Sequence, residues 1–278
     1  MKLHFETSRA TYYHGDARQM DALASESVAM VITSPPYYDA RPEYAAWGDY
    51  HAYLKDMLTV WQECHRVLMD GGRIAVNVPM GYGRSATPYT LIGMHIAAQM
   101  ETLFTLRGII VWYKTTSDVG SLLGTAWGTY QSAVNPSLRD SYEIIIVGHK
   151  GNPSRLAGEN TIIADDFLLS TETTWRIPPA PPSWHPAPFP AEIPRRLIEL
   201  YTFKNDVVLD PFSGSGTTVR VAAQLERHGI GVDLNLDYLN RTTEEARFKV
   251  NGWENPPKPT RFSKRNTPKV DLPMFGEM

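Results

Sequence analysis

Short apolar runs alternate with segments of helical periodicity along most of this chain of 278 residues. Residues 28–33, for example, are apolar and stop at a proline-bearing loop, as a buried parallel strand does. Strands that alternate with helices predict a parallel or mixed α/β sheet covered on both faces. The expected strands are residues 28–33, 73–78, 107–113, 142–148, 207–209 and 230–232. The expected helices are residues 53–68, closed by Gly71-Gly72 as a C-cap, and residues 91–103, 195–201, 217–226 and 238–249.

Length and composition place the chain among ordinary globular proteins. It is 42% hydrophobic and 21% charged, and its length suits one domain with a small insert. We expect a cytoplasmic protein with no membrane partner, because no run of 18 apolar residues and no signal-peptide core occur. One cysteine, Cys64, excludes an internal disulfide and a multi-thiolate zinc site. The formal net charge of -3 argues mildly against a nucleic-acid partner, although net charge does not report local patches.

Three segments depart from the alternation of strands and helices. Residues 115–141 are rich in Gly, Ser and Thr and resemble a long functional loop. Residues 151–190 contain a proline run at 178–182, which predicts irregular structure. Residues 253–278 are proline-bearing and predict an extended tail, so we expect one domain over residues 1–252.

A glycine turn joins the strand at residues 207–209 to the helix that follows it. Gly214 and Gly216 allow a tight turn whose free backbone N–H groups a ligand can approach closely. A Walker phosphate loop is excluded because Thr217 stands where lysine is required, and a dinucleotide fingerprint is weakened because Val219 replaces its third glycine.

An acidic residue, Asp233, ends the next expected strand, where it can accept hydrogen bonds from ribose hydroxyls. A nucleoside cofactor without phosphates remains, and S-adenosyl-L-methionine is the obvious candidate. The alternative is a structural glycine turn with incidental acids.

A second motif, Ser34-Pro35-Pro36-Tyr37, follows the strand at residues 28–33 and so lies at its carboxyl edge, where open α/β sheets bind ligands. The prolines stiffen the loop and aim the Ser34 hydroxyl and the Pro35 carbonyl in one direction. These two acceptors could take both hydrogens of an exocyclic amine, while Tyr37 offers a face on which a flipped base can stack. The alternative is a polar turn in which Tyr37 and Tyr38 only pack.

The two motifs together resemble those of the exocyclic-amino DNA methyltransferases, which make N4-methylcytosine or N6-methyladenine. The motif at 34–37 precedes the motif at 210–218, an order similar to that of the permuted β group. The resemblance implies a Rossmann-like, mostly parallel seven-stranded sheet, S-adenosyl-L-methionine as methyl donor and double-stranded DNA as substrate. It also allows a cognate restriction endonuclease and a second copy of the chain as partners.

The resemblance assigns roles to individual residues. Asp16 would lie near the adenine of the cofactor, and Phe189 would lie at the methionine end of the cofactor. For His185, a cofactor contact and a structural role are both open. Residues 112–114 resemble the wall of the base pocket, or else pack as an aromatic strand end. No metal is expected. The catalytic residues would be Ser34, Pro35, Pro36 and Tyr37. The cofactor-binding residues would be Asp16, Phe189, Asp210, Pro211, Phe212, Gly214, Gly216, Thr217, Thr218 and Asp233.

The sequence constrains the target base less than it constrains the type of reaction. In this family Ser-Pro-Pro-Tyr is associated with cytosine N4, so we favour it over adenine N6. Methylation of carbon 5 is excluded because it needs a nucleophilic cysteine, and Cys64 lies on an apolar helical stripe. An RNA methyltransferase and a silent nucleic-acid-binding module remain alternatives.

Target recognition is expected in residues 115–141 and 151–182. Their neighbourhood holds basic residues that could contact phosphates or guanine, or simply be solvated. These residues are Lys114, Arg139, Lys150, Arg155 and Arg176.

Overall fold

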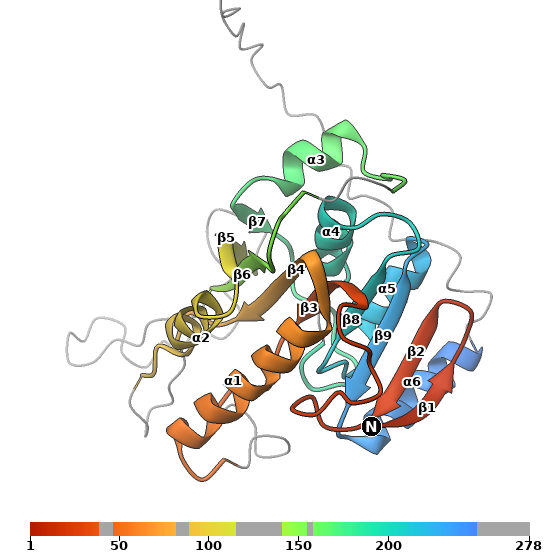
Figure 1. Cartoon of the computed structure of the whole chain (residues 1–278), viewed down its shortest axis with the longest axis horizontal. Coiled ribbons are helices and arrows are strands. Elements are labelled where there is room, and N and C mark those ends of the chain that lie inside the picture. Colours follow the sequence, from red (N-terminus) through yellow and green to blue (C-terminus); the bar gives the residue numbers. More distant parts are fainter. Residues whose placement is uncertain (39–46, 82–88, 115–140, 155–157, 189, 249–278) are drawn as a thin grey trace, which may run out of the picture.

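The computed structural model describes residues 1–38, 47–81, 89–114, 141–154, 158–188 and 190–248. In these residues a single sheet has the order β1-β2-β9-β8-β3-β4-β6-β5-β7 (Figure 1). Its strands are β1 (Lys2–Glu6), β2 (Ala10–His14), β3 (Val28–Thr33), β4 (Leu68–Val78), β5 (Thr105–Tyr113), β6 (Tyr142–His149), β7 (Thr174–Arg176), β8 (Val207–Asp210) and β9 (His228–Asp233). The helices are α1 (Tyr50–Val67), α2 (Ile92–Glu101), α3 (Ala164–Ser170), α4 (Glu192–Tyr201), α5 (Thr217–Gln224) and α6 (Leu236–Phe248).

The sheet is mostly parallel, which confirms the predicted fold class. Strands β2, β9, β8, β3 and β4 are parallel neighbours, and β7 is parallel to β5. Only β6 with its two neighbours and the β1–β2 pair are antiparallel within the described residues. The six strands expected from the sequence correspond to β9, β8, β3, β4, β6 and β5, and β2 completes the seven strands that the resemblance implied. The short edge strands β1 and β7 extend the sheet to nine strands in the described part of the chain.

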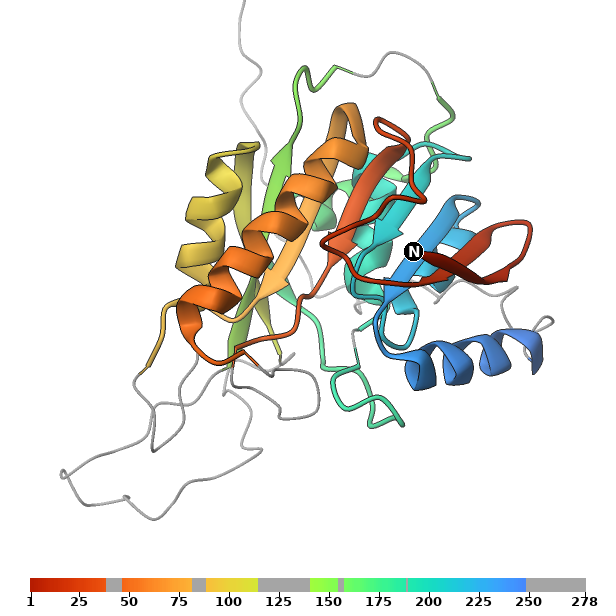
Figure 2. The same cartoon turned by 60° about the horizontal axis from the view of Figure 1, so that its bottom comes forward.

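Helices cover both faces of the sheet (Figures 1 and 2). Side chains alternate along β3, so that Val31 packs with α1 and α2 while Met30 and Ile32 pack with α4 and α5. Every residue of β3 is buried, which explains why its sequence is an uninterrupted apolar run. Because β3 and β8 are parallel neighbours, the loops that follow Thr33 and Asp210 leave the same edge of the sheet.

The predicted helix C-cap at Gly71-Gly72 is wrong. Helix α1 ends at Val67, and β4 begins at once at Leu68, so the glycine pair does not cap the helix. Gly71 instead adopts a φ of 71° inside β4, where the pairing with β3 shifts register. A bulge and a helix C-cap both call for a glycine with positive φ, and the sequence does not distinguish them.

Four elements were not predicted: β1, β2, α3 and β7. The last two lie within residues 151–190, which we expected to be irregular, and β7 is too short to show a periodicity. Residues 115–140 and 249–278 lie outside the described residues, so the expected loop and tail, and the domain limits, remain predictions. None of the helices in the part described has the length and apolar content that crossing a bilayer would require.

Candidate active site

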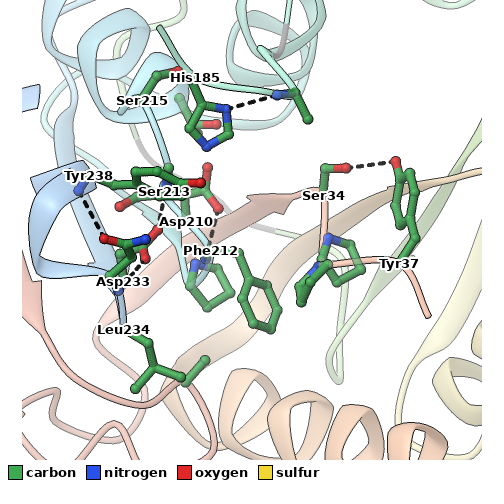
Figure 3. Close-up of a pocket in the computed structure, with 18 of the residues that line it drawn as sticks. Ser34, Tyr37, His185, Asp210, Phe212, Ser213, Ser215, Asp233, Leu234 and Tyr238 are labelled. Atoms are coloured by element: carbon green, nitrogen blue, oxygen red, sulfur yellow. Dashed lines mark hydrogen bonds between the residues drawn. The ribbon is translucent and has the colours of Figure 1, made fainter. Parts of the chain in front are cut away.

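A cavity of about 1140 Å³ lies at the carboxyl edge of the sheet and is lined by both sequence motifs. The loop after β3 contributes residues 34–37. The end of β8, the turn after it and the start of α5 contribute residues of 210–218, and the end of β9 contributes Asp233. Figure 3 shows Ser34 and Tyr37 on one side of the cavity and Asp233 on the other. Two segments far apart in the sequence therefore share one cavity.

The turn between β8 and α5 requires glycine at two positions. Gly214 has a φ of 47° and Gly216 a φ of 69°, both in the left-handed region. A Cβ on Gly214 would lie 2.7 Å from Nε2 of His185, and one on Gly216 would lie 2.5 Å from the Tyr12 hydroxyl. Gly216 is the N-cap of α5 and, unlike Gly214, does not line the cavity. The turn is therefore packed closely at both glycines. The prediction of free N–H groups is wrong for Ser213, Gly214 and Gly216, because all three donate to other groups of the protein.

Asp233 holds this turn against the loop after β9. Its Oδ2 accepts from the Gly214 N–H at 2.8 Å and its Oδ1 from the Asn235 N–H at 2.8 Å. Burial raises the pKa of Asp233. Each carboxylate oxygen can accept more than one hydrogen bond, so hydroxyls of a ligand in the cavity can still be bound.

Asp210 joins the two motifs directly. Its Oδ1 accepts from the Thr33 hydroxyl at 2.7 Å and from the Phe212 N–H at 3.1 Å. Thr33 is the residue immediately before Ser34, so Asp210 couples the glycine turn to the Ser-Pro-Pro-Tyr loop. Burial raises the pKa of Asp210 to about 6. Asp210 lines the cavity, as expected, but its bond to Thr33 was not predicted.

The Ser34 hydroxyl lies 2.9 Å from the Tyr37 hydroxyl (Figure 3). The Tyr37 hydroxyl in turn donates to Oε2 of Glu143 at 3.1 Å. Burial, together with the negative charge of Glu143, raises the pKa of Tyr37 well above its usual value. Tyr37 therefore keeps its proton at neutral pH and is a hydrogen-bond donor. The predicted stacking on a base involves the Tyr37 ring. The structure shows in addition that the Tyr37 hydroxyl takes part in a hydrogen-bond network.

Glu143 is a cavity residue that the sequence analysis missed. It lies on β6 with 8% of its surface exposed, and Lys114 binds its Oε1 at 2.6 Å. Asn77 of β4 donates to its Oε2 at 2.5 Å. A charged side chain within the apolar run of β6 was the available signal, because an acid is rarely buried without partners.

The remaining predicted residues divide between the cavity and other places. Asp16 lines the cavity, and Arg18, bound at 2.6 Å, holds the pKa of Asp16 below its usual value. His185 also lines the cavity and packs edge-on against Tyr238. Phe189 lies outside the described residues.

Of the five basic candidates for DNA contact, Lys114 lines the cavity, and it is paired with Glu143 rather than solvated. Lys150 binds the Leu68 carbonyl at 2.8 Å, at the opposite end of β4. The guanidinium of Arg176 lies 5.2 Å from the centre of the Tyr113 ring. Arg139 and Arg155 lie outside the described residues.

Comparisons with known proteins agree with this geometry. A family model described as DNA methylase matches residues 28–245. The type II methyltransferase M.MjaI of Methanocaldococcus jannaschii is 28% identical over 80% of this chain and 86% of its own length. The DNA adenine methyltransferase YhdJ of Escherichia coli is 25% identical over 84% of this chain and 82% of its own.

Solved structures with the same fold include TTHA0409 of Thermus thermophilus, complexed with S-adenosyl-L-methionine. It superposes with a TM-score of 0.71 at 28% identity and covers 88% of this chain and 96% of its own. The cytosine-N4-specific PvuII DNA methyltransferase superposes with a TM-score of 0.69 at 21% identity and covers 90% of this chain and 94% of its own. At this level of identity, the similarity to the PvuII enzyme shows a shared fold.

Proposed function

This chain belongs to the family of DNA methylases that act on N6 of adenine or N4 of cytosine, and within that family we propose that it methylates N4 of cytosine in double-stranded DNA. The methyl donor is S-adenosyl-L-methionine. The base is expected to leave the helix and enter the cavity, because its amine cannot be reached inside a stacked duplex.

The single observation that carries the proposal is the meeting of two distant loops at one cavity, where Asp210 bonds to Thr33. Pockets that hold small ligands have volumes of about 300–1,000 Å³, so this cavity has room for a nucleoside cofactor and a base. Gly214 lines the cavity without a side chain, and Asp233 can accept from ribose hydroxyls. Phe212 and Leu234 add apolar lining (Figure 3).

Bound S-adenosyl-L-methionine supplies an electrophilic methyl group on a sulfonium. The Ser34 hydroxyl and the Pro35 carbonyl accept the two hydrogens of the cytosine amine, which keeps its lone pair from delocalising into the ring. The nitrogen then attacks in line, so that an N–C bond forms while the S–C bond breaks, and the surplus proton leaves afterwards to solvent or a nearby acceptor. Positioning and charge stabilisation supply most of the rate, and no strong base is needed before attack.

Cytosine is preferred over adenine because the first residue of the motif is Ser34 rather than Asp or Asn. Adenine N6 is the second candidate, and the similarity to the adenine methyltransferase YhdJ supports keeping it. A cytoplasmic location, a cognate restriction endonuclease and a homodimer remain predictions.

The test is nucleotide-resolution mapping of modified bases in DNA from cells that express either the wild type or Ser34→Ala. We expect N4-methylcytosine at a short recognition site in the first sample and none in the second. Purified Ser34→Ala should bind S-adenosyl-L-methionine as the wild type does. N6-methyladenine would overturn the choice of base, and methylation confined to RNA would overturn the DNA substrate. A fully active Ser34→Ala would refute the role given to that hydroxyl.

A further inference from the structure

We propose that Glu143 is a positioning residue, which fixes the direction of a hydrogen-bond chain so that the Ser34 hydroxyl is an acceptor for the substrate amine. The inference rests on the proposed methylation of an exocyclic amine. It concerns a residue that touches Tyr37 rather than Ser34 or the base.

Glu143 is surrounded by donors. Lys114, Asn77 and Tyr37 contact its carboxylate at 2.6, 2.5 and 3.1 Å, from the end of β5, from β4 and from the loop after β3. An ionised carboxylate can only accept hydrogen bonds. Lys114 offsets its negative charge, because a buried carboxylate paired with an ammonium group is far less costly than an isolated one.

The direction of the chain follows from counting protons. The Tyr37 hydroxyl has one proton, and its bond to Glu143 uses it, because Glu143 has none to give. In the 2.9 Å contact between Ser34 and Tyr37, the Ser34 hydroxyl must therefore be the donor. Its own proton is then committed. Of its two lone pairs, one faces the Asn77 amide at 3.5 Å and the other can accept a hydrogen bond from the cavity.

This direction matters for the chemistry. A serine hydroxyl that was free to rotate could donate to the amine nitrogen and occupy the lone pair that must attack the methyl group. A hydroxyl whose proton points to Tyr37 can only accept from the amine, which leaves the lone pair available. The arrangement is thus in place before the base arrives, which is what preorganised catalysis requires.

Glu143→Gln tests the chain with little change of shape. The new amide nitrogen can donate to the Tyr37 oxygen once Asn77, which donates to the same carboxylate oxygen at 2.5 Å, turns its amide oxygen toward it. The Tyr37 proton would then turn toward Ser34 and reverse the chain. We expect kcat for DNA methylation to fall by about 10- to 100-fold, the range that one misdirected hydrogen bond can cause. Affinity for S-adenosyl-L-methionine should be unchanged, because the network lies on the base side of the cavity.

Tyr37→Phe is a second variant that keeps the ring and the charge of Glu143 but removes the connecting hydroxyl. It should lose kcat to a similar extent. The double variant Tyr37→Phe with Glu143→Gln should be no worse than Tyr37→Phe alone, because Glu143 acts through that hydroxyl. A merely structural Glu143 would instead give losses that add.

Glu63→Gln is the matched control. This carboxylate is also partly buried and paired with an arginine, Arg66, but it does not line the cavity. It should lower the melting temperature and leave kcat unchanged.

The inference is overturned if Glu143→Gln or Tyr37→Phe keeps kcat within about twofold of the wild type, or if their effects multiply in the double variant. It is also overturned if Glu143→Gln loses cofactor affinity in proportion to kcat. Absence of any DNA methylation by the wild type is a different result, because it refutes the proposed function and this inference with it.

Discussion

Asp210 is a buried carboxyl group that serves two loops at once. It is 6% exposed and accepts hydrogen bonds from Thr33 and from the Phe212 backbone. These bonds favour the ionised form, but burial outweighs them and raises the pKa of Asp210 from its usual 3.8 to about 6. Keeping Asp210 ionised in the folded protein therefore lowers the free energy of unfolding, and the size of this cost depends on pH.

Asp210→Asn should reveal this cost as a pH-dependent difference in stability. Folded Asp210 holds its proton up to about pH 6, whereas the unfolded chain loses it near 3.8. The stability that this proton gives is complete below 3.8 and is lost as the pH rises to about 6. Asparagine is always neutral and keeps an oxygen for Thr33. The free energy of unfolding of the variant relative to the wild type should rise by about 2–3 kcal/mol between about pH 4 and pH 7.

Urea unfolding of both proteins across this pH range measures the difference. Glu172→Gln, in which an exposed carboxyl is neutralised, is the control and should show no such trend. A difference between Asp210→Asn and the wild type that does not change with pH would contradict the prediction.

At the scale of elements, β7 shows how three residues can be held in place by one side chain. Trp175 is fully buried and packs among residues of α4, and the Arg196 guanidinium lies 5.2 Å from the centre of its ring. Main-chain pairing with β5 places Trp175 beside Trp112. A strand this short has few ladder bonds, so side-chain burial must provide most of its stability.

Trp175→Ala should therefore lower the free energy of unfolding by about 3–5 kcal/mol, as expected when a fully buried aromatic side chain is removed. Denaturant unfolding followed by circular dichroism measures this loss. Thr174→Ala, on the neighbouring exposed residue, should change stability by less than about 0.5 kcal/mol. A loss below about 1 kcal/mol for Trp175→Ala would show that β7 is held in another way.

At the scale of the whole molecule, the cavity is assembled from the ends of several strands. A ligand that contacts the loops after β3, β8 and β9 must stabilise the folded state as a unit, since the unfolded chain has no such site. At a concentration of about 100 times its Kd, S-adenosyl-L-methionine should add about 2.7 kcal/mol. For a chain of this size that corresponds to a rise in melting temperature of about 5–10 °C.

Asp233→Ala should remove most of that rise, because Asp233 holds the glycine turn and is expected to bind the ribose hydroxyls. Asp165→Ala, on the exposed side of α3, should retain it. Thermal unfolding with and without the cofactor gives both values. An equal rise in Asp233→Ala and the wild type would refute the cofactor role of this residue.

The local elements were predictable where one short segment carries its own signal. The apolar runs of β3 and β6 indicated strands buried on both faces, because such strands need no alternation. The glycines at 214 and 216 indicated a tight turn, since their left-handed backbone has few alternatives. Local signals were insufficient at Gly71, because a helix C-cap and a β-bulge both call for glycine. They were also insufficient for an element as short as β7.

The sequence by itself determined the alternation of strands and helices, both loop motifs and their place at the carboxyl edge of the sheet. These features depend on side-chain pattern and backbone conformation within a few residues. Only the tertiary structure decided that Thr33 meets Asp210 and that Tyr37, Asn77 and Lys114 converge on Glu143. Those contacts depend on strand order and register, because hydrogen bonds between residues so far apart form only after the sheet brings their strands together.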